Sequence, residues 1–293
     1  MKKQLDNYRQ YLEKTALSEN TILSYIKDME SYCDYLKEKR VRDITKVSDK
    51  KINEYIETMK SHGKANSTIL RSVAAIKKYY AFLIEEDVID KNPASSIVRP
   101  QMEKKLPSVI APREIVKILN QPKCVDLKGY RDKAMLELVY ATGIKVSELI
   151  ALNVKDVDIY GGMLLCNAGR NKRYIPIGKQ AAEALDNYIK KARPLMVRNG
   201  RIKTLFVNCS GTPLTRQGFW KILRHYADMA GIKTDINAQT LRHSFAIHLL
   251  QNGADINAVS EMLGHSDVET TRLYNQVLKD NIKKIYKKAH PRA

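Results

Sequence analysis

Apolar residues recur every three or four positions in four stretches of the first 90 or so residues, which places them on one side of a helix in each stretch. The spacing predicts helices over residues 5–14, 18–36, 48–59 and 66–83. Ser18 suits the start of the second helix, because a serine hydroxyl accepts hydrogen bonds from the backbone N–H groups of the first turn. Four such amphipathic helices predict one small helical domain.

The helical spacing is lost between residues 91 and 112, where four prolines occur. They are Pro93, Pro100, Pro107 and Pro112. Proline lacks a backbone N–H and is excluded from the interior of a regular helix, so this stretch predicts a linker. We therefore expect two domains, one over residues 1–103 with its linker from about residue 91, and a second over residues 107–293.

The second domain is also mostly helical in its pattern, with one change of period in the middle. Helices are predicted over residues 113–119, 130–142, 146–152, 179–192, 215–230, 240–251, 255–263 and 267–288. Residues 163–167 and 173–177 favour two paired strands, with residues 168–172 as the tip of a hairpin between them. The fold class that follows is mainly α with a small β-sheet.

Charge indicates the kind of partner. The chain of 293 residues has a formal net charge of +19, and its 44% of hydrophobic residues is enough for two ordinary cores. Such a charge favours a polyanionic partner bound through its phosphates, which points to double-stranded DNA. No apolar run approaches the roughly 18 residues of a membrane span, and we find neither a basic amphipathic helix nor a lipidation motif, so we expect no membrane partner.

The four cysteines lie far apart, and none belongs to a C-x-x-C pair. They are Cys33, Cys124, Cys166 and Cys209. This distribution is typical of buried or idle thiols in the reducing cytoplasm, where we expect the protein to act. We also expect neither a metal nor a cofactor, since the sequence shows no cluster of carboxylates suited to magnesium and no zinc pattern.

Three residue types suited to phosphate chemistry stand near the C-terminus. Arg242 lies in Leu-Arg-His-Ser-Phe-Ala, His265 follows a glycine, and Tyr274 ends Thr-Thr-Arg-Leu-Tyr nine residues later. A guanidinium can hold two phosphate oxygens at once, and a phenol oxygen can attack phosphorus. Leu241 and Phe245 belong to the apolar stripe of the helix that carries Arg242, so we expect this arginine to lie off the core face.

With these motifs the whole chain resembles the tyrosine recombinases of the phage integrase family, most of all their short Xer-type members. The resemblance implies a four-helix, SAM-like core-binding domain and a catalytic domain that close on DNA as a clamp. It implies that Tyr274 attacks the scissile phosphate, forms a 3′-phosphotyrosine and releases a 5′-hydroxyl, while Arg242 and His265 bind the phosphate. The activity implied is site-specific DNA recombination without a cofactor.

Three positions depart from the pattern of that family. Lys145 stands where the family has its first arginine, and Gln239 where it has a histidine three residues before Arg242. The family's hairpin lysine, the acid that protonates the leaving oxygen, corresponds to Ala168 or Gly169. Lysine retains the charge of arginine but loses its bidentate grip. Arg170 or Lys172 could reach the leaving oxygen in place of the missing lysine, but an arginine is a poor acid.

The segment after Tyr274 combines lysines with an apolar stripe that includes Ile282, Ile285 and Tyr286. In Xer-like proteins the terminal helix docks into a neighbouring protomer, so the resemblance implies self-association on DNA in a tetrameric synapse. The sequence identifies neither the target site nor any accessory recombination protein. Two alternatives stay open: a DNA-binding paralogue with impaired cleavage, which would share the fold and the charge, and a type IB topoisomerase, which would share the chemistry.

Overall fold

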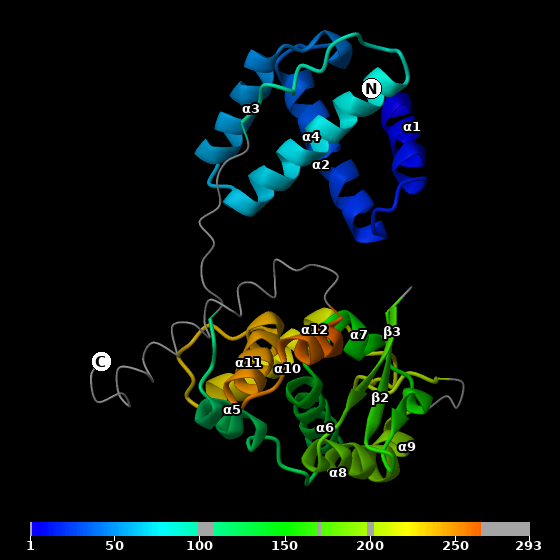
Figure 1. Cartoon of the computed structure of the whole chain (residues 1–293), viewed down its shortest axis with the longest axis vertical. Coiled ribbons are helices and arrows are strands. Elements are labelled where there is room, and N and C mark those ends of the chain that lie inside the picture. Colours follow the sequence, from blue (N-terminus) through cyan, green and yellow to red (C-terminus); the bar gives the residue numbers. More distant parts are fainter. Residues whose placement is uncertain (1, 99–107, 169–170, 198–201, 265–293) are drawn as a thin grey trace, which may run out of the picture. The chain divides into compact units, whose positions relative to one another are not determined.

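The computed structural model of the chain describes residues 2–98, 108–168, 171–197 and 202–264. The chain divides into two compact units, residues 1–104 (unit 1) and residues 105–293 (unit 2). Both units are drawn in Figure 1, where helices dominate and a small sheet lies in unit 2. The prediction of a mainly α fold with a small β-sheet is therefore confirmed.

Unit 1 is built from the four predicted helices. They are α1 (Lys2–Glu13), α2 (Glu19–Glu38), α3 (Asp49–Ser61) and α4 (Asn66–Glu85), with a 3₁₀ turn, η1 (Ile44–Lys46), before α3. Ser18 caps α2 as expected, because its hydroxyl accepts the backbone N–H of Thr21. The apolar stripe of each helix faces a shared core, so the periodicity alone was sufficient to locate these elements.

Tyrosines fill the centre of unit 1. Tyr8, Tyr32, Tyr79 and Tyr80 are all fully buried, and the hydroxyl of Tyr80 donates to the Ile44 carbonyl at 3.1 Å. The carboxylate of Asp28 on α2 accepts two hydrogen bonds from the Arg71 guanidinium on α4, at 2.8 and 2.9 Å. This bidentate pair fixes the two longest helices of unit 1 against each other.

Unit 2 contains eight α-helices among its described residues. They are α5 (Pro112–Leu119), α6 (Leu127–Thr142), α7 (Val146–Ala151), α8 (Lys179–Asn187), α9 (Arg193–Met196), α10 (Arg216–Met229), α11 (Ala238–Gln251) and α12 (Ile256–Leu263). A 3₁₀ turn, η2 (Val154–Asp156), follows α7, and a π-helical turn, η3 (Tyr188–Ala192), joins α8 to α9. The predicted helix over residues 267–288 lies outside the described residues.

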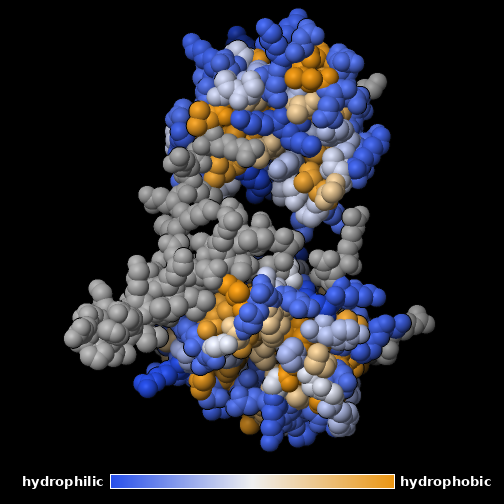
Figure 2. All heavy atoms as spheres, viewed as in Figure 1, coloured by the Kyte–Doolittle hydropathy of each residue, from blue (hydrophilic) through white to orange (hydrophobic). Residues whose placement is uncertain are grey.

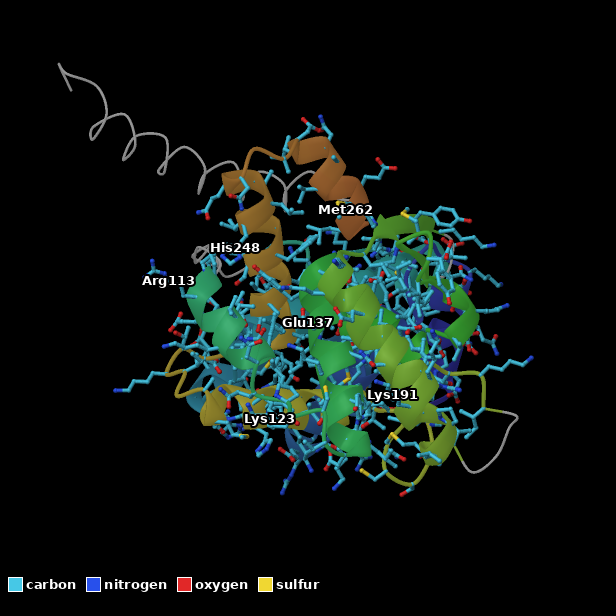
Figure 3. All side chains as sticks on the ribbon, turned by 90° about the horizontal axis from the view of Figure 1, so that it is seen from below. Arg113, Lys123, Glu137, Lys191, His248 and Met262 are labelled. Carbon is cyan, nitrogen blue, oxygen red and sulfur yellow. The ribbon has the colours of Figure 1, made fainter. Side chains whose placement is uncertain are left out.

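Helix α6 forms the centre of unit 2, in contact with α8 and α11 (Figure 3). It is buried on most sides, and three of its charged residues are buried: Arg131 pairs with Asp132, and Glu137 pairs with the partly buried Lys133. Figure 2 shows that hydrophilic side chains prevail on the visible face of each unit, with apolar residues scattered among them. Among the described helices, none has the length and apolar character required to cross a membrane.

The sheet is antiparallel, in the order β1 (Val157–Asp158), β2 (Met163–Ala168) and β3 (Asn171–Pro176). The strands β2 and β3 extend further than predicted, because Ala168 pairs with Asn171 and Asn167 with Lys172. The expected five-residue tip over 168–172 is therefore wrong, and Lys172 lies in a paired strand. Small and polar residues near a tight turn carry no apolar alternation, so the sequence pattern marked the hairpin end too early.

Gly143, which ends α6, shows how tightly unit 2 is packed. Its φ of +59° is left-handed, and a Cβ added there would lie 2.3 Å from Phe245 and 2.9 Å from Leu263. Gly231 has a similar φ of +69°, but a Cβ there would meet nothing within 4 Å. The two glycines thus share the same backbone requirement and differ only in the space around them.

We expect Gly143→Ala to destabilise unit 2 more than Gly231→Ala does. Both variants incur the left-handed strain of about 1–2 kcal/mol, and Gly143→Ala adds an overpacking cost of about 1–3 kcal/mol. Urea denaturation of both variants and the parent chain measures the difference in the free energy of unfolding. An equal loss in the two variants would show that Phe245 and Leu263 yield without cost.

Candidate active site

Arg242 lies at the centre of the candidate site, where three helices of unit 2 meet. Its side chain projects from α11 and donates from Nη1 to the Gly143 carbonyl at 2.6 Å and from Nη2 to the Leu263 carbonyl at 2.5 Å. These carbonyls stand at the C-terminal ends of α6 and α12, where no intrahelical partner is available to them. The arginine therefore holds two helix ends together.

The expectation that Arg242 lies off the core face is wrong, because the residue is only 7% exposed. Helix α11 is buried around most of its circumference, so the stripe of Leu241 and Phe245 does not mark its one inward face. Two of the five N–H groups of the guanidinium are used on the helix-end carbonyls. These contacts fix the plane of the fork and thus the direction from which an anion can be bound.

Lys145 comes two residues after Gly143, the C-cap of α6, and is itself the N-cap of α7. Its side chain is exposed, and its backbone N–H donates to Oε2 of Glu148 at 2.8 Å. Arg242 binds the carbonyl of Gly143, so the loop that carries Lys145 begins at the guanidinium. The structure thus brings Arg242 and Lys145 to the same corner of unit 2.

Beneath this corner Glu148 forms a buried ion pair with Arg173. The side chains are 5% and 9% exposed, and the guanidinium is bidentate, with Nη1 to Oε1 at 3.0 Å and Nη2 to Oε2 at 2.9 Å. Burial by itself raises the pKa of Glu148, but hydrogen bonds from Arg173 and from the Lys145 backbone hold that pKa below its ordinary value. The nearby charge of Arg242 acts in the same direction.

Cys166 pairs with Arg173 across the hairpin and is fully buried. Burial, followed by the charge of Glu148, raises the pKa of this thiol to about 11. A thiol that remains protonated at neutral pH is a poor nucleophile and a poor metal ligand. Cys166 is therefore a structural residue beside Arg173, as expected for a buried, idle thiol.

The other predicted residues lie around this corner or beyond the described parts of the chain. Gln239 is exposed in the first turn of α11, three residues before Arg242 and so on the same side of the helix. Lys172 is exposed on β3, and the alternation of a strand places it on the face opposite to Arg173. His265 and Tyr274 lie outside the described residues, as does the whole segment after them.

Sequence reasoning missed Glu148 and Arg173 as members of the site. A signal for both was present. Glu148 is the third residue of a short helix, where a carboxylate can reach back to the N-cap N–H. Arg173 precedes Ile175 and Ile177 at the spacing of two that marks the inward face of a strand. A charged residue at an inward position predicts a buried partner, here Glu148.

The charge at this corner favours an anion. Arg242, Arg173 and Lys145 provide three cations, and Glu148 provides one carboxylate. Burial of His243, together with the charge of Arg242 beside it, lowers the pKa of that imidazole and keeps it neutral. Within the described ranges, no three His, Cys, Asp or Glu side chains lie together as the ligands of a metal ion would. The arrangement can hold and neutralise a phosphate group.

Sequence comparison identifies relatives along the whole chain. Residues 108–281 match the phage integrase family, and residues 5–87 match the phage integrase N-terminal SAM-like domain. The chain is 39% identical over 291 residues to the tyrosine recombinase XerD of Staphylococcus haemolyticus, with 99% of both chains covered. It is 42% identical over 281 residues to XerD of Oceanobacillus iheyensis, with 95% of this chain and 94% of that protein covered.

Structural comparison indicates the same fold. The integrase of the Tn1549 transposon in complex with circular intermediate DNA superposes with a TM-score of 0.74 at 20% identity, over 97% of this chain and 98% of that one. The XerH site-specific recombinase bound to its difH substrate superposes with a TM-score of 0.71 at 21% identity, over 96% of this chain and 84% of that one. At these identities the superpositions bear on the fold alone.

The depressed pKa of Glu148 predicts a pH-dependent stability. A carboxylate with a lowered folded pKa stabilises the protein above its unfolded pKa of about 4.3 and loses that effect as pH falls through the folded value. The difference in the free energy of unfolding between the parent chain and Glu148→Gln should thus be large near neutral pH and shrink below about pH 4. Urea denaturation of both proteins across this range measures it, and a difference independent of pH would contradict the assignment.

Proposed function

The chain belongs to the phage integrase family, and from this premise we propose how its residues carry out strand cleavage and rejoining. It is a tyrosine recombinase, an enzyme of site-specific DNA recombination whose partner is DNA. The whole-length match to recombinases favours this activity over that of a DNA-binding paralogue without cleavage. The proposal assigns a role to each residue of the site.

Arg242 binds the scissile phosphate. The observation that supports this role is the pair of hydrogen bonds from its guanidinium to the ends of α6 and α12, which orient the fork before DNA arrives. A donor fixed in advance stabilises the charge that develops on the phosphate oxygens without a cost of reorganisation at the moment of reaction. The backbone carbonyls of Gly143 and Leu263 therefore hold the guanidinium of this arginine in position.

Tyr274 is the nucleophile. Its phenol oxygen loses a proton and attacks phosphorus, the bond to the 5′-oxygen breaks, and the leaving oxygen takes up a proton to become a 5′-hydroxyl. A 3′-phosphotyrosine retains the energy of the phosphodiester, so a second 5′-hydroxyl can displace the tyrosine in the reverse sense and rejoin the strands. His265 donates a hydrogen bond to the same phosphate, and Gln239 assists through its amide.

Lys145 neutralises the phosphate from the N-cap of α7, where its exposed ammonium can approach only as a point charge. Protonation of the leaving oxygen is assigned to Lys172, because a lysine can lose its proton whereas an arginine cannot. Lys172 must reach that oxygen from the opposite face of the hairpin. Both features predict slow cleavage compared with a site that has arginine at 145 and lysine at 168 or 169.

The assembly that we propose is a tetramer on two DNA duplexes in the cytoplasm. It is supported by the net charge of +19, which suits a protein that covers many phosphates, and by the apolar stripe over Ile282, Ile285 and Tyr286. In this proposal the segment after Tyr274 contacts a neighbouring protomer. The domains that grip each duplex are residues 1–103 and 107–293.

The nucleophile is tested with a suicide substrate, a DNA duplex containing the target site and a nick beside the scissile phosphate. The parent chain should form a covalent protein–DNA complex that survives a denaturing gel, because the nicked fragment diffuses away and cannot religate. Tyr274→Phe should abolish this complex and leave DNA affinity unchanged. Tyr160→Phe, a matched change at an exposed tyrosine of unit 2, should retain it. A complex that persists in Tyr274→Phe would assign the nucleophile to another residue.

Restoring arginine at position 145 should accelerate cleavage. We expect Lys145→Arg to raise the rate of covalent complex formation at least about 10-fold, equivalent to about 1.4 kcal/mol of barrier, because a fork replaces a point charge on the transition state. Lys155→Arg, an exposed lysine of η2, serves as the control and should leave the rate unchanged. A slower reaction in Lys145→Arg would mean that the site is adapted to lysine.

A further inference from the structure

We propose that Arg173 is the positioning residue of the active site, and that it sets the placement of both Lys145 and His265 without touching DNA. The inference rests on the proposed function, since it concerns how the same pocket is held in shape. Arg173 lies on β3, whereas Lys145 begins α7 and His265 follows α12 along the chain. One buried guanidinium thus joins three elements that are distant in sequence.

The first connection runs from Arg173 through Glu148 to Lys145. Arg173 donates two hydrogen bonds to the Glu148 carboxylate, and Oε2 of that carboxylate accepts the backbone N–H of Lys145 at 2.8 Å. The carboxylate therefore ties the first backbone N–H of α7 to the hairpin. Without Arg173, the buried Glu148 carboxylate would retain only uncharged hydrogen-bond partners such as the Lys145 backbone N–H and the Cys166 thiol, and it would tend to turn away or become protonated.

The second connection runs from Arg173 to the end of α12. Its Nε donates to the Met262 carbonyl at 2.7 Å, while Arg242 donates to the next carbonyl, that of Leu263. Two adjacent carbonyls at one helix end are thus held by two different arginines. Met262 is labelled in Figure 3 near the end of α12, the helix that contacts β3. The two arginines together fix the direction in which the chain leaves this helix.

Gly264 confirms how closely the guanidinium of Arg173 underlies that exit. Gly264 has a left-handed φ of +62°, and a Cβ added there would lie 2.8 Å from Nη1 of Arg173. The backbone can pass over the guanidinium only because this residue has no side chain. His265 is the next residue along the chain, so the proposed effect of Arg173 on His265 runs through Gly264.

Arg173 is not a phosphate ligand in this arrangement. Each of its three nitrogens already donates to a protein acceptor, Nε to Met262 and both terminal nitrogens to Glu148. Its effect on cleavage must therefore act through the geometry of other residues, where an error of about 1 Å can cost about 100-fold in rate.

The test compares Arg173→Gln with Arg131→Gln, which breaks a second buried ion pair of unit 2. Arg131 pairs with Asp132 at 2.7 Å, and the two side chains are 5% and 7% exposed, so both variants should lose similar stability. At saturating suicide substrate and a temperature where circular dichroism shows both folded, Arg173→Gln should cleave about 100-fold more slowly. DNA affinity should stay near that of the parent chain, and Arg131→Gln should cleave at nearly the parental rate.

A second measurement, amide hydrogen exchange on the free protein, does not depend on cleavage. Arg173→Gln should lose protection at the start of α7 and the end of α12, whereas Arg131→Gln should retain it. If Arg173→Gln loses this protection but even the parent chain never forms a covalent complex, the proposed function would be refuted and the positioning role would stand. Parental exchange at both helix ends, or parental cleavage in Arg173→Gln, would overturn the positioning role.

Arg173→Lys decides the matter if the glutamine variant does not fold. Lysine preserves the charge opposite Glu148 but cannot bind that carboxylate and the Met262 carbonyl together in the same geometry. We expect a stability close to the parent and a cleavage rate reduced at saturating DNA. A variant with parental cleavage would show that only the charge of Arg173 is required, and the positioning role would then be overturned.

Discussion

Backbone carbonyls at the ends of two helices dictate the architecture of this candidate site. The last carbonyls of a helix lack intrahelical partners, and where α6 and α12 end inside unit 2 those groups need donors. Arg242 and Arg173 provide them, through the carbonyls of Gly143, Leu263 and Met262. The requirement that completes the fold thus places two guanidinium groups side by side in a covered corner.

This arrangement leaves an excess of positive charge that the protein only partly offsets. Glu148 is the buried carboxylate of the corner, and it is bound bidentately to Arg173. Arg242 gains from the proximity of that carboxylate but is coordinated by neutral carbonyls. A buried cation held by carbonyl dipoles is stabilised further by an anion, which favours the binding of a phosphate at this corner.

The helix positions could be predicted from the sequence because the spacing of apolar residues and the N-cap residues depend only on neighbours along the chain. The helices α2, α3 and α4 needed only their apolar stripes and the residues that start them. The burial of Arg242 was not predictable in this way, because α11 is enclosed on most sides and a stripe of Leu241 and Phe245 cannot reveal that. Nor does any local pattern pair Arg173 with Glu148, since 25 residues separate them. A guanidinium that caps two helix ends depends on tertiary contacts, which local periodicity does not encode.

Two of the departures from the family pattern lie at exposed positions, whereas the buried arginine agrees with that pattern. Lys145 and Gln239 are both exposed, and the cap of α7 uses the backbone N–H of residue 145, so a different side chain there leaves the hydrogen bond to Glu148 intact. Arg242, by contrast, is buried and holds two helix ends, so its replacement would disturb the fold as well as the chemistry. Substitutions at exposed positions change the rate at little cost in stability. A buried arginine with structural contacts is constrained by the fold as well as by the proposed phosphate binding, whereas the fold constrains the exposed side chains at positions 145 and 239 much less.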